Sequence, residues 1–321
     1  MKRFLSITLT LTAVFIQLPP VHAQGFPTKP VRVVVGYPPG GASDTVARIV
    51  AQELSLINKQ AFIVENKPGV GGMLSMSNVA KSLPDGYTLG IGVSGTLTTG
   101  PHLQKTKLYD PLTDFESIGM VSKAPMVLLA GPSFKYDSVS ALIREAKARP
   151  GEIMFASGAQ AFELALKLLN TQANINLGSI PYAGGAQASI DVLGGRVPLM
   201  VDTIGAQQEN IKAGKLRALA MLDSKRSPLF PDVPTMAESG VTDYEAVGWI
   251  SLVAAKGTPQ PIVKKLNQQL QQVLEKPEVR QKLLSIGFEP SGGTPNDLVR
   301  TIQTDYAKWG QIIKAAGMTP Q

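Results

Sequence analysis

The sequence predicts an α/β fold built from two related lobes. Strand-like runs rich in β-branched residues alternate with amphipathic helix-like runs, which is the order that builds sheets covered by helices. Two glycine loops of similar sequence stand about 145 residues apart, and each leads into a helix-like run. The length of 321 residues allows two domains of about 150 residues each. Two lobes that face one cleft account for all three observations.

The first 23 residues have the features of a cleavable secretory signal peptide. Two basic residues precede an apolar run at 4–18, and small residues end the segment at Ala23. The run is shorter than the roughly 20 residues of a membrane span, so an uncleaved anchor is the less favoured alternative. Gln24 follows the expected cleavage point where a lipoprotein has cysteine. We expect a mature chain that begins near Gln24 and is soluble in the periplasm.

In the first third of the chain, the apolar pattern predicts a strand at 31–36 and a helix with Val46 and Leu54 on one face. Ser43 or Asp44 is placed to be the N-cap of this helix. The elements expected next are a strand at 61–66, a turn at 69–72, a helix at 73–83, a strand at 87–93, a loose stretch at 94–111, and strands at 118–121 and 126–130.

The alternation continues through the middle of the chain and gives way to helices near its end. The middle elements are expected to be a helix at 138–149, a strand at 153–156, a helix at 162–172, a helix start at 190–193, a strand at 197–202, a helix at 207–213 and a strand at 216–222. A strand at 249–255 and amphipathic helices at 261–274, 278–284 and 296–316 follow. We expect these helices to form an outer layer on a sheet, in preference to a membrane or nucleic-acid surface.

The first glycine loop, at 37–44, has the features of an anion-binding turn. A strand, a glycine turn and a helix start leave free backbone N–H groups at the positive end of the helix dipole, where they suit a carboxylate or a phosphate. Gly36 and Gly41 have the spacing of a nucleotide P-loop, but Ala42 stands where that motif needs lysine, and the loop does not contain G-x-G-x-x-G. The alternative is a tight connection that binds nothing.

The second glycine loop, at 180–189, repeats this pattern. Both loops carry a tyrosine and then Gly-Gly-Ala before a helix-like run. The repetition predicts that each lobe contributes one such loop to the cleft, although a chance likeness of two Gly-Gly turns is the alternative.

Composition restricts the chemistry. Without residues 1–23 the chain has 29 basic and 24 acidic residues, a net charge of +5 that is spread along the sequence and does not favour a nucleic-acid partner. Cysteine is absent, which excludes disulfides, thiol nucleophiles and zinc–thiolate sites. His102 is the only histidine outside the leader, so a histidine-rich metal site is excluded. We expect no metal and no cofactor.

A search for catalytic residues is largely negative. Ser43 and Ser157 have no assured histidine partner, and no G-x-S-x-G elbow is present. Asp44, Asp191 and Asp202 could form an acid/base pair in three dimensions, but capping roles explain them more simply. His102 is expected at the surface or a pocket edge, and Trp249 in the core. We therefore expect no catalytic residues and no enzyme activity.

Over nearly its whole mature length the chain resembles the substrate-receptor family of tripartite tricarboxylate transporters, the Bug or TctC-like periplasmic solute-binding proteins. The stretches that carry the resemblance are FPTKPVRVVVGYPPGGASDTVAR (26–48), VENKPGVGG (64–72), PDGYTLG (84–90), YDPLTDF (109–115), IPYAGGAQA (180–188), IKAGKLRALA (211–220), RSPLFPDVPTMAESG (226–240), KGTP (256–259) and AAGMTP (315–320). The resemblance implies the two-lobed type II periplasmic binding protein fold, or Venus flytrap, with a mixed sheet flanked by helices in each lobe. It also implies capture of a small carboxylate and delivery to inner-membrane transporter subunits.

The resemblance further implies a set of ligand-binding residues in both lobes. The first lobe would contribute Tyr37, Pro39, Gly40, Gly41, Asp44, Ser94, Thr96 and Thr98. The second lobe would contribute Ser157, Gly158, Ala159, Gln160, Tyr182, Gly184, Gly185 and Asp202. In this family, backbone N–H groups, hydroxyls and bridging waters hold the ligand carboxylate, and water-mediated contacts cost little relative to direct ones.

The sequence departs from the family pattern in the second lobe. The turn at 157–162, which in the family is usually rich in Gly, Asn and Ser, has lost hydroxyls, is one residue shorter, and carries an amide and a phenyl ring. Gly100 replaces a usual asparagine, while Ala183 and Gln187 replace a usual lysine and proline. These differences predict a ligand other than a simple dicarboxylate, such as an amino acid or an aromatic acid.

The alternation and the resemblance together predict the lobe boundaries. The first lobe is expected at 24–125 and 248–321 and the second at 126–247, with hinge segments near 124–127 and 247–249. We expect a monomeric receptor. An exported sensor or signalling partner is the alternative function, and a cleft enzyme acting on a small acid is the less favoured one.

Overall fold

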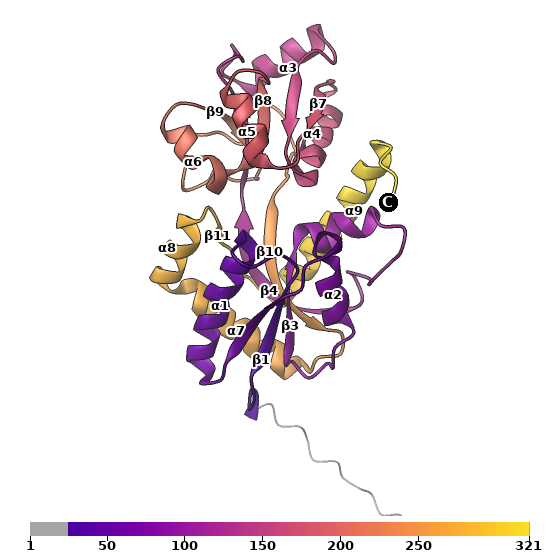
Figure 1. Ribbon diagram of the computed structural model, residues 1–321, viewed down its shortest axis with the longest axis vertical. Coiled ribbons are helices and arrows are strands. Elements are labelled where there is room, and N and C mark those ends of the chain that lie inside the picture. Colours follow the sequence, from indigo (N-terminus) through magenta and orange to yellow (C-terminus); the bar gives the residue numbers. More distant parts are fainter. Residues whose placement is uncertain (1–24, 321) are drawn as a thin grey trace, which may run out of the picture.

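The computed structural model describes residues 25–320, and the expected signal peptide at 1–23 lies outside them. The chain forms two lobes, each with its own β-sheet, that are joined by extended segments (Figure 1). Both sheets are mixed and flanked by helices. The predicted fold class is therefore confirmed.

The sheet of the first lobe has six strands in the order β11-β4-β10-β3-β1-β2. Their bounds are β1 Val31–Val35, β2 Phe62–Asn66, β3 Thr88–Val93, β4 Phe115–Ala124, β10 Gly248–Ala255 and β11 Glu289–Pro290. Strands β1, β2 and β3 are parallel, and β10 runs antiparallel to both of its neighbours, β3 and β4. The carboxyl ends of β1, β2 and β3 consequently lie along one edge of the sheet.

Helices cover both faces of the first sheet. They are α1 Ala42–Asn58, α2 Met73–Ala80, α7 Gln260–Glu275, α8 Pro277–Ser285 and α9 Pro295–Ala315. In β1, Val33 packs in the core cluster that contains Leu54 of α1 and Leu270 of α7, whereas Val34 packs with Met76 of α2 on the opposite face. Both faces of the strand are buried, which explains its run of valines at 33–35.

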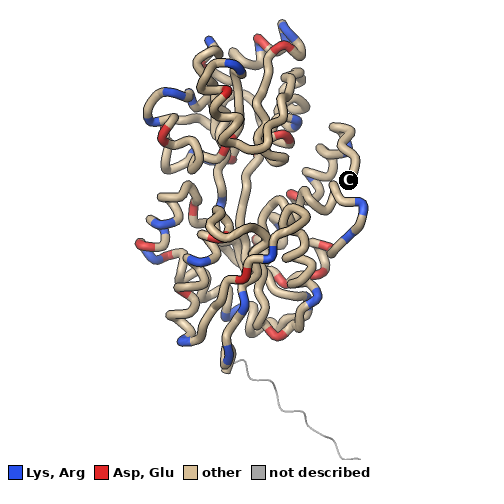
Figure 2. The backbone as a smooth tube through the Cα atoms, in the orientation of Figure 1, with Lys and Arg blue, Asp and Glu red and all other residues tan. Residues whose placement is uncertain are grey.

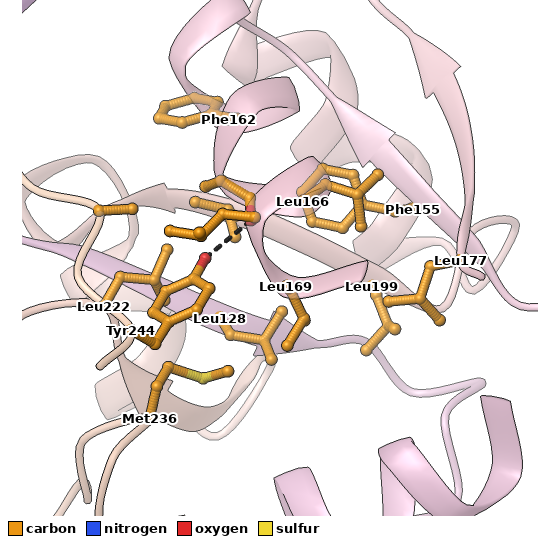
Figure 3. Close-up of a cluster of buried hydrophobic side chains, with 14 of the residues drawn as sticks. Leu128, Phe155, Phe162, Leu166, Leu169, Leu177, Leu199, Leu222, Met236 and Tyr244 are labelled. Carbon is orange, nitrogen blue, oxygen red and sulfur yellow. Dashed lines mark hydrogen bonds between the residues drawn. The ribbon is translucent and has the colours of Figure 1, made fainter. Parts of the chain in front are cut away.

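The second sheet has five strands in the order β7-β6-β8-β5-β9. Its elements are β5 Met126–Ala130, α3 Val139–Ala148, β6 Met154–Ser157, α4 Gln160–Ala173, β7 Gly178–Pro181, α5 Gly185–Leu193, β8 Leu199–Thr203, α6 Ile204–Lys212 and β9 Arg217–Met221. Leu166 and Leu169 of α4 lie in one core cluster with Leu128 of β5 (Figure 3). Beside them the Tyr244 hydroxyl donates to the Ala165 carbonyl at 2.8 Å, so this buried polar group is satisfied.

Two segments connect the sheets. Strand β4 of the first sheet continues through Pro125 into β5 of the second, and the segment that follows β9 returns to the first sheet at Gly248, which pairs with Ala124. Strand β5 begins beside the end of β8, because Met126 pairs with Thr203. Since β6 and β7 run parallel to β8, the carboxyl ends of all three point toward the first lobe.

Helix α9 contacts both lobes. Its first half places Leu298 and Ile302 in a core cluster of the first lobe, in agreement with the expected outer layer. Its second half places Trp309 and Ile313 in the main core cluster of the second lobe, and the helix rises beside α4 (Figure 1). The expectation that this helix forms an outer layer on one sheet therefore holds only for its first half.

The lobes also touch on the side of α6 and α8. Lys123 of β4 binds both carboxylate oxygens of Asp223 at 3.2 Å, and the Ser227 hydroxyl donates to Glu289 of β11 at 2.6 Å. Gly205 of α6 packs so tightly on the loop after α8 that an added Cβ would lie 2.6 Å from the Ile286 carbonyl oxygen.

Several elements differ from the sequence-based expectation for tertiary reasons. Strand β4 extends well beyond 118–121, because it pairs with β10 along its whole length. The stretch expected to be loose begins with short helical turns at Gly95–Thr99 and Gly100–His102. The edge strands β7 and β11 have half-buried, partly polar residues and no apolar run that could reveal them.

Basic and acidic residues are interspersed along the backbone of both lobes (Figure 2). Within residues 25–320, no helix is long and apolar enough to cross a membrane. The same residues contain no cluster of three or more potential metal ligands.

Candidate functional site

The first-lobe loop begins where β1 ends at Gly36. A Cβ at Gly36 would lie 2.6 Å from the Ser75 hydroxyl oxygen, so only glycine fits against the start of α2. Gly40 has φ +81°, a left-handed conformation that glycine adopts without strain. In Figure 1 the loop and the beginning of α1 lie at the end of the first lobe that faces the second.

The N-cap of α1 is Gly41, so the expectation of Ser43 or Asp44 at that position was wrong. The helix starts earlier than the apolar pattern indicates, because the extended Gly41 backbone precedes a first turn of small polar residues. Asp44 lies in that first turn and reaches back to accept the Gly40 N–H at 2.8 Å. The backbone N–H groups of Ala42 and Ser43 have no hydrogen-bond acceptor within residues 25–320.

Asp44 anchors the loop from inside. Its carboxylate also accepts from Arg48 Nε at 2.9 Å and from Asn66 Nδ2 at 2.8 Å, and Asn66 in turn donates to the Tyr37 carbonyl. Burial by itself raises the pKa of Asp44, but these hydrogen bonds outweigh it and lower the pKa to about 2. Groups of the protein itself therefore bind the Asp44 carboxylate. The side chain positions the loop and does not line the cavities described below.

A second first-lobe loop follows β3. Thr96 and Thr98 are buried, and their hydroxyls bond to the backbone carbonyls of Val93 and Ser94. The side chains that face the space between the lobes are instead those of Ser94 and Thr99.

In the second lobe, the turn after β6 packs on the start of α5. A Cβ at Gly158 would lie 2.6 Å from the Gly185 Cα atom, so the two loops touch through their backbones. Asp202, at the end of β8, is buried beneath this contact and accepts from Gln207 Nε2 and the Thr203 N–H. Burial raises the pKa of Asp202, while these two hydrogen bonds oppose the rise. Within this cluster, the Tyr182 hydroxyl is turned away to donate to Asp191 at 2.8 Å.

Two cavities lie between the lobes. The larger, of about 670 Å³, is lined by Tyr37, Gly71, Thr99 and Gln104 from the first lobe and by Gln160 from the second. The smaller, of about 130 Å³, lies nearer the connecting segments. They share three lining residues, Gly95, Thr99 and Ala161, and therefore adjoin. None of the residues that line either cavity is charged.

A further hollow of about 390 Å³ lies between β10 and α9. Four of its six charged side chains pair with one another, since the Asp305 carboxylate accepts from Trp249 Nε1 and from Lys308, each at 2.8 Å, and Arg300 pairs with Asp297. Its Lys123 binds Asp223. We therefore place the candidate site in the two adjoining cavities, which both lobes line.

Residues 46–318 match the model of the tripartite tricarboxylate transporter family receptor. The chain belongs to this receptor family. It is 38% identical to protein BugT of Bordetella pertussis over 303 residues, which covers 93% of this chain and 92% of BugT. The structure of Rpa4515 of R. palustris with adipate is similar at TM-score 0.76 and 36% identity, and the match covers 92% of this chain and 100% of that one. MatC (Rpa3494) from Rhodopseudomonas palustris, with bound malate, is similar at TM-score 0.72 and 30% identity, covering 90% of this chain and 100% of MatC.

The family consists of solute-binding receptors, and one similar structure is that of the periplasmic binding protein BugD. The predicted family is therefore confirmed. The location of the cavities agrees with the general rule that ligands of open α/β sheets bind outside the carboxyl ends of the strands.

The structure brings some of the expected site residues of this receptor to the cavities. Tyr37, Ser94 and Gln160 line them directly. The others do not line the cavities and lie in the adjacent loops, helix starts and strand ends, namely Pro39, Gly40, Gly41, Asp44, Thr96, Thr98, Ser157, Gly158, Ala159, Tyr182, Gly184, Gly185 and Asp202.

Several lining residues escaped the sequence reasoning. Trp309, Met318 and Thr319 come from α9 and the segment after it, and Val247 comes from a connecting segment. The helical spacing of Trp309 was a signal of burial, but it could not tell against which lobe the indole packs.

His102 lies at the edge of this region, as expected. It stacks on Tyr306, and its Nε2 atom lies 2.9 Å from the Tyr306 carbonyl oxygen. Trp249 is buried in a core cluster of the first lobe, also as expected.

Proposed function

We propose that this chain is a periplasmic receptor that captures a small organic carboxylate between its lobes and delivers it to a tripartite tricarboxylate-type permease of the inner membrane. The observation that carries the proposal is the pair of adjoining cavities, which both lobes line at the carboxyl ends of their strands. Relatives that bind adipate and malate support a carboxylate as the ligand.

The chemistry of the larger cavity suits an anion held without a cationic side chain. Gln160 and Ala161 are the first residues of α4, and no bonding partner for their N–H groups occurs within residues 25–320. The positive end of the α4 dipole therefore faces the cavity. The Tyr37 hydroxyl donates to the Gly71 carbonyl at 3.1 Å, and the Gln104 amide lines the same space.

The proposal includes the division into lobes at 24–125 with 248–321 and at 126–247, and closure about the segments near 124–127 and 247–249. Closure would bring the loops that carry Gly41 and Gly185 toward the cavity, where their N–H groups could bind the ligand directly or through water. Because a closed cleft also presents a new surface, closure would signal occupancy to the permease.

The test is a thermal-shift screen of the purified mature chain against adipate, malate, amino acids and aromatic acids, followed by product analysis of each hit. A receptor is stabilised by a ligand in proportion to the logarithm of its concentration over Kd and leaves the ligand unchanged. Catalytic conversion of the strongest hit, or the absence of any stabilising carboxylate, would contradict the proposal.

A further inference from the structure

The smaller cavity is an apolar chamber on the hinge side of the site. Its larger side chains are those of Met126, Phe162, Leu164, Val247 and Trp309, which come from both lobes, a connecting segment and α9. The volume of about 130 Å³ is close to that of apolar cavities that accept a benzene molecule, which measure about 150 Å³. The chamber thus has the size of one six-membered ring.

The chamber has few polar side chains, namely the hydroxyls of Ser94, Thr99 and Thr203. The Ser94 hydroxyl accepts from the backbone N–H of Trp249 at 3.4 Å, and the Thr99 hydroxyl donates to the Gly95 carbonyl at 3.3 Å. No lysine or arginine lines it. A second carboxylate placed in the chamber would therefore be buried among mostly apolar side chains without a cationic partner, which is unfavourable.

The chamber opens toward the groups that suit an anion. It shares Gly95, Thr99 and Ala161 with the larger cavity, where the Gln160 amide and the start of α4 are found. A ligand that occupies both spaces needs a charged end in the larger cavity and an uncharged, compact end in the chamber.

Phe162 gives the chamber its aromatic wall. Its ring is 8% exposed and belongs to the same buried cluster as Trp309. In Figure 3 the ring stands at the margin of that cluster, apart from Phe155 and Tyr244, and it lines the chamber. Aromatic pairs add attraction beyond the area that they bury.

We propose that the ligand is an aromatic monocarboxylate, whose ring fills the chamber against Phe162 and whose carboxylate lies in the larger cavity. This inference rests on the proposed carboxylate-receptor function and narrows its substrate class. A linear dicarboxylate would have to place its second charge in the chamber or leave the chamber unfilled.

The first test compares benzoate and phenylacetate with adipate and malate by calorimetry on the full mature chain. At least one aromatic monocarboxylate is expected to bind ten times more tightly than either dicarboxylate. Tighter binding of adipate or malate would overturn the aromatic proposal and leave the receptor function standing. Failure of every carboxylate to bind would overturn both.

The second test narrows the opening of the chamber. Ala161 is exposed and lines both cavities, so Ala161→Leu fills the shared passage without disturbing the core. Affinity for the aromatic ligand is expected to fall at least tenfold while the Tm stays within about 1 °C. Ala307→Leu is the matched control, because Ala307 is an exposed alanine of α9 outside both cavities.

Phe162→Ala and Phe162→Leu supply a readout of the ring itself. The alanine variant is expected to lose about tenfold in affinity for the aromatic ligand, and the leucine variant less. Equal losses for aromatic and linear carboxylates, or unchanged aromatic binding in both Phe162→Ala and Ala161→Leu, would refute the placement of the ring in the chamber.

Discussion

Asp44→Asn tests whether a buried charge organises the first-lobe loop. The wild-type carboxylate is 2% exposed and accepts from Gly40, Arg48 and Asn66. These bonds lower its pKa from 3.8 to about 2 in the folded state. At about 1.4 kcal/mol per pKa unit, the ionised form contributes about 2 kcal/mol to the free energy of unfolding at pH 7. At 2–4 °C per kcal/mol for domains of this size, the variant should melt about 4–8 °C lower.

The pH dependence separates this charge effect from a packing defect. A carboxyl group with a lowered pKa stabilises the fold above its unfolded pKa and loses that contribution as pH falls through its folded pKa. The difference in Tm between wild type and Asp44→Asn should be full above pH 5 and should shrink between pH 4 and pH 2. Melting curves at pH 7, 5, 3 and 2 measure it, with Ser43→Ala in the same helical turn as control. A difference that stays constant from pH 7 to pH 2 would refute the electrostatic account.

Three further predictions concern the contacts between loops and lobes. Gly158→Val should weaken ligand binding at least tenfold in the thermal-shift assay, because the valine side chain collides with Gly185. Gly184→Ala is the control, since nothing lies within 4 Å of its added Cβ, and its Tm should stay unchanged. Gly205→Ala should push the lobes apart where α6 meets the loop after α8 and raise the radius of gyration measured by small-angle X-ray scattering. Gly25→Ala, at an exposed glycine, serves as the control. An unchanged radius of gyration in Gly205→Ala would contradict the expectation. Burial raises the pKa of Glu289, so the neutral carboxyl favours folding at low pH, and this contribution is lost as pH rises through the folded pKa. The Tm of Glu289→Gln should therefore exceed that of wild type at pH 8 and equal it at pH 4. Equal Tm values for the two proteins at both pH values would contradict this account.

The local sequence pattern was sufficient to predict an element where a single physical cause determines it. The valines of β1 are buried on both faces, so their run predicted a strand with the correct position. Two glycines of the first loop are required by its geometry, Gly36 because a Cβ would collide with Ser75 and Gly40 because its φ is positive. Their positions therefore indicated the turn.

Pattern was insufficient where a distant partner decides the outcome. The full length of β4 depends on β10, more than 120 residues away in the chain. Thr96 and Thr98 have hydroxyls that suit a ligand, but the helical turn at 95–99 directs both to backbone carbonyls. The sequence alone could not distinguish these threonines from Ser94 and Thr99, which face the cavities.

The alternating strand-like and helix-like runs and the two Gly-Gly loops were enough to predict an α/β fold of two lobes with anion-capable turns, because these patterns act over a few residues. The receptor function was predicted from the resemblance of longer stretches to a known family. The tertiary structure alone placed Phe162, Val247 and Trp309 around one chamber. These residues are separated by about 60 to 150 positions and meet only because two sheets and a helix that spans both lobes pack together. Hydrophobic burial predicts that such side chains are inside, and the topology of the chain decides which of them share a wall.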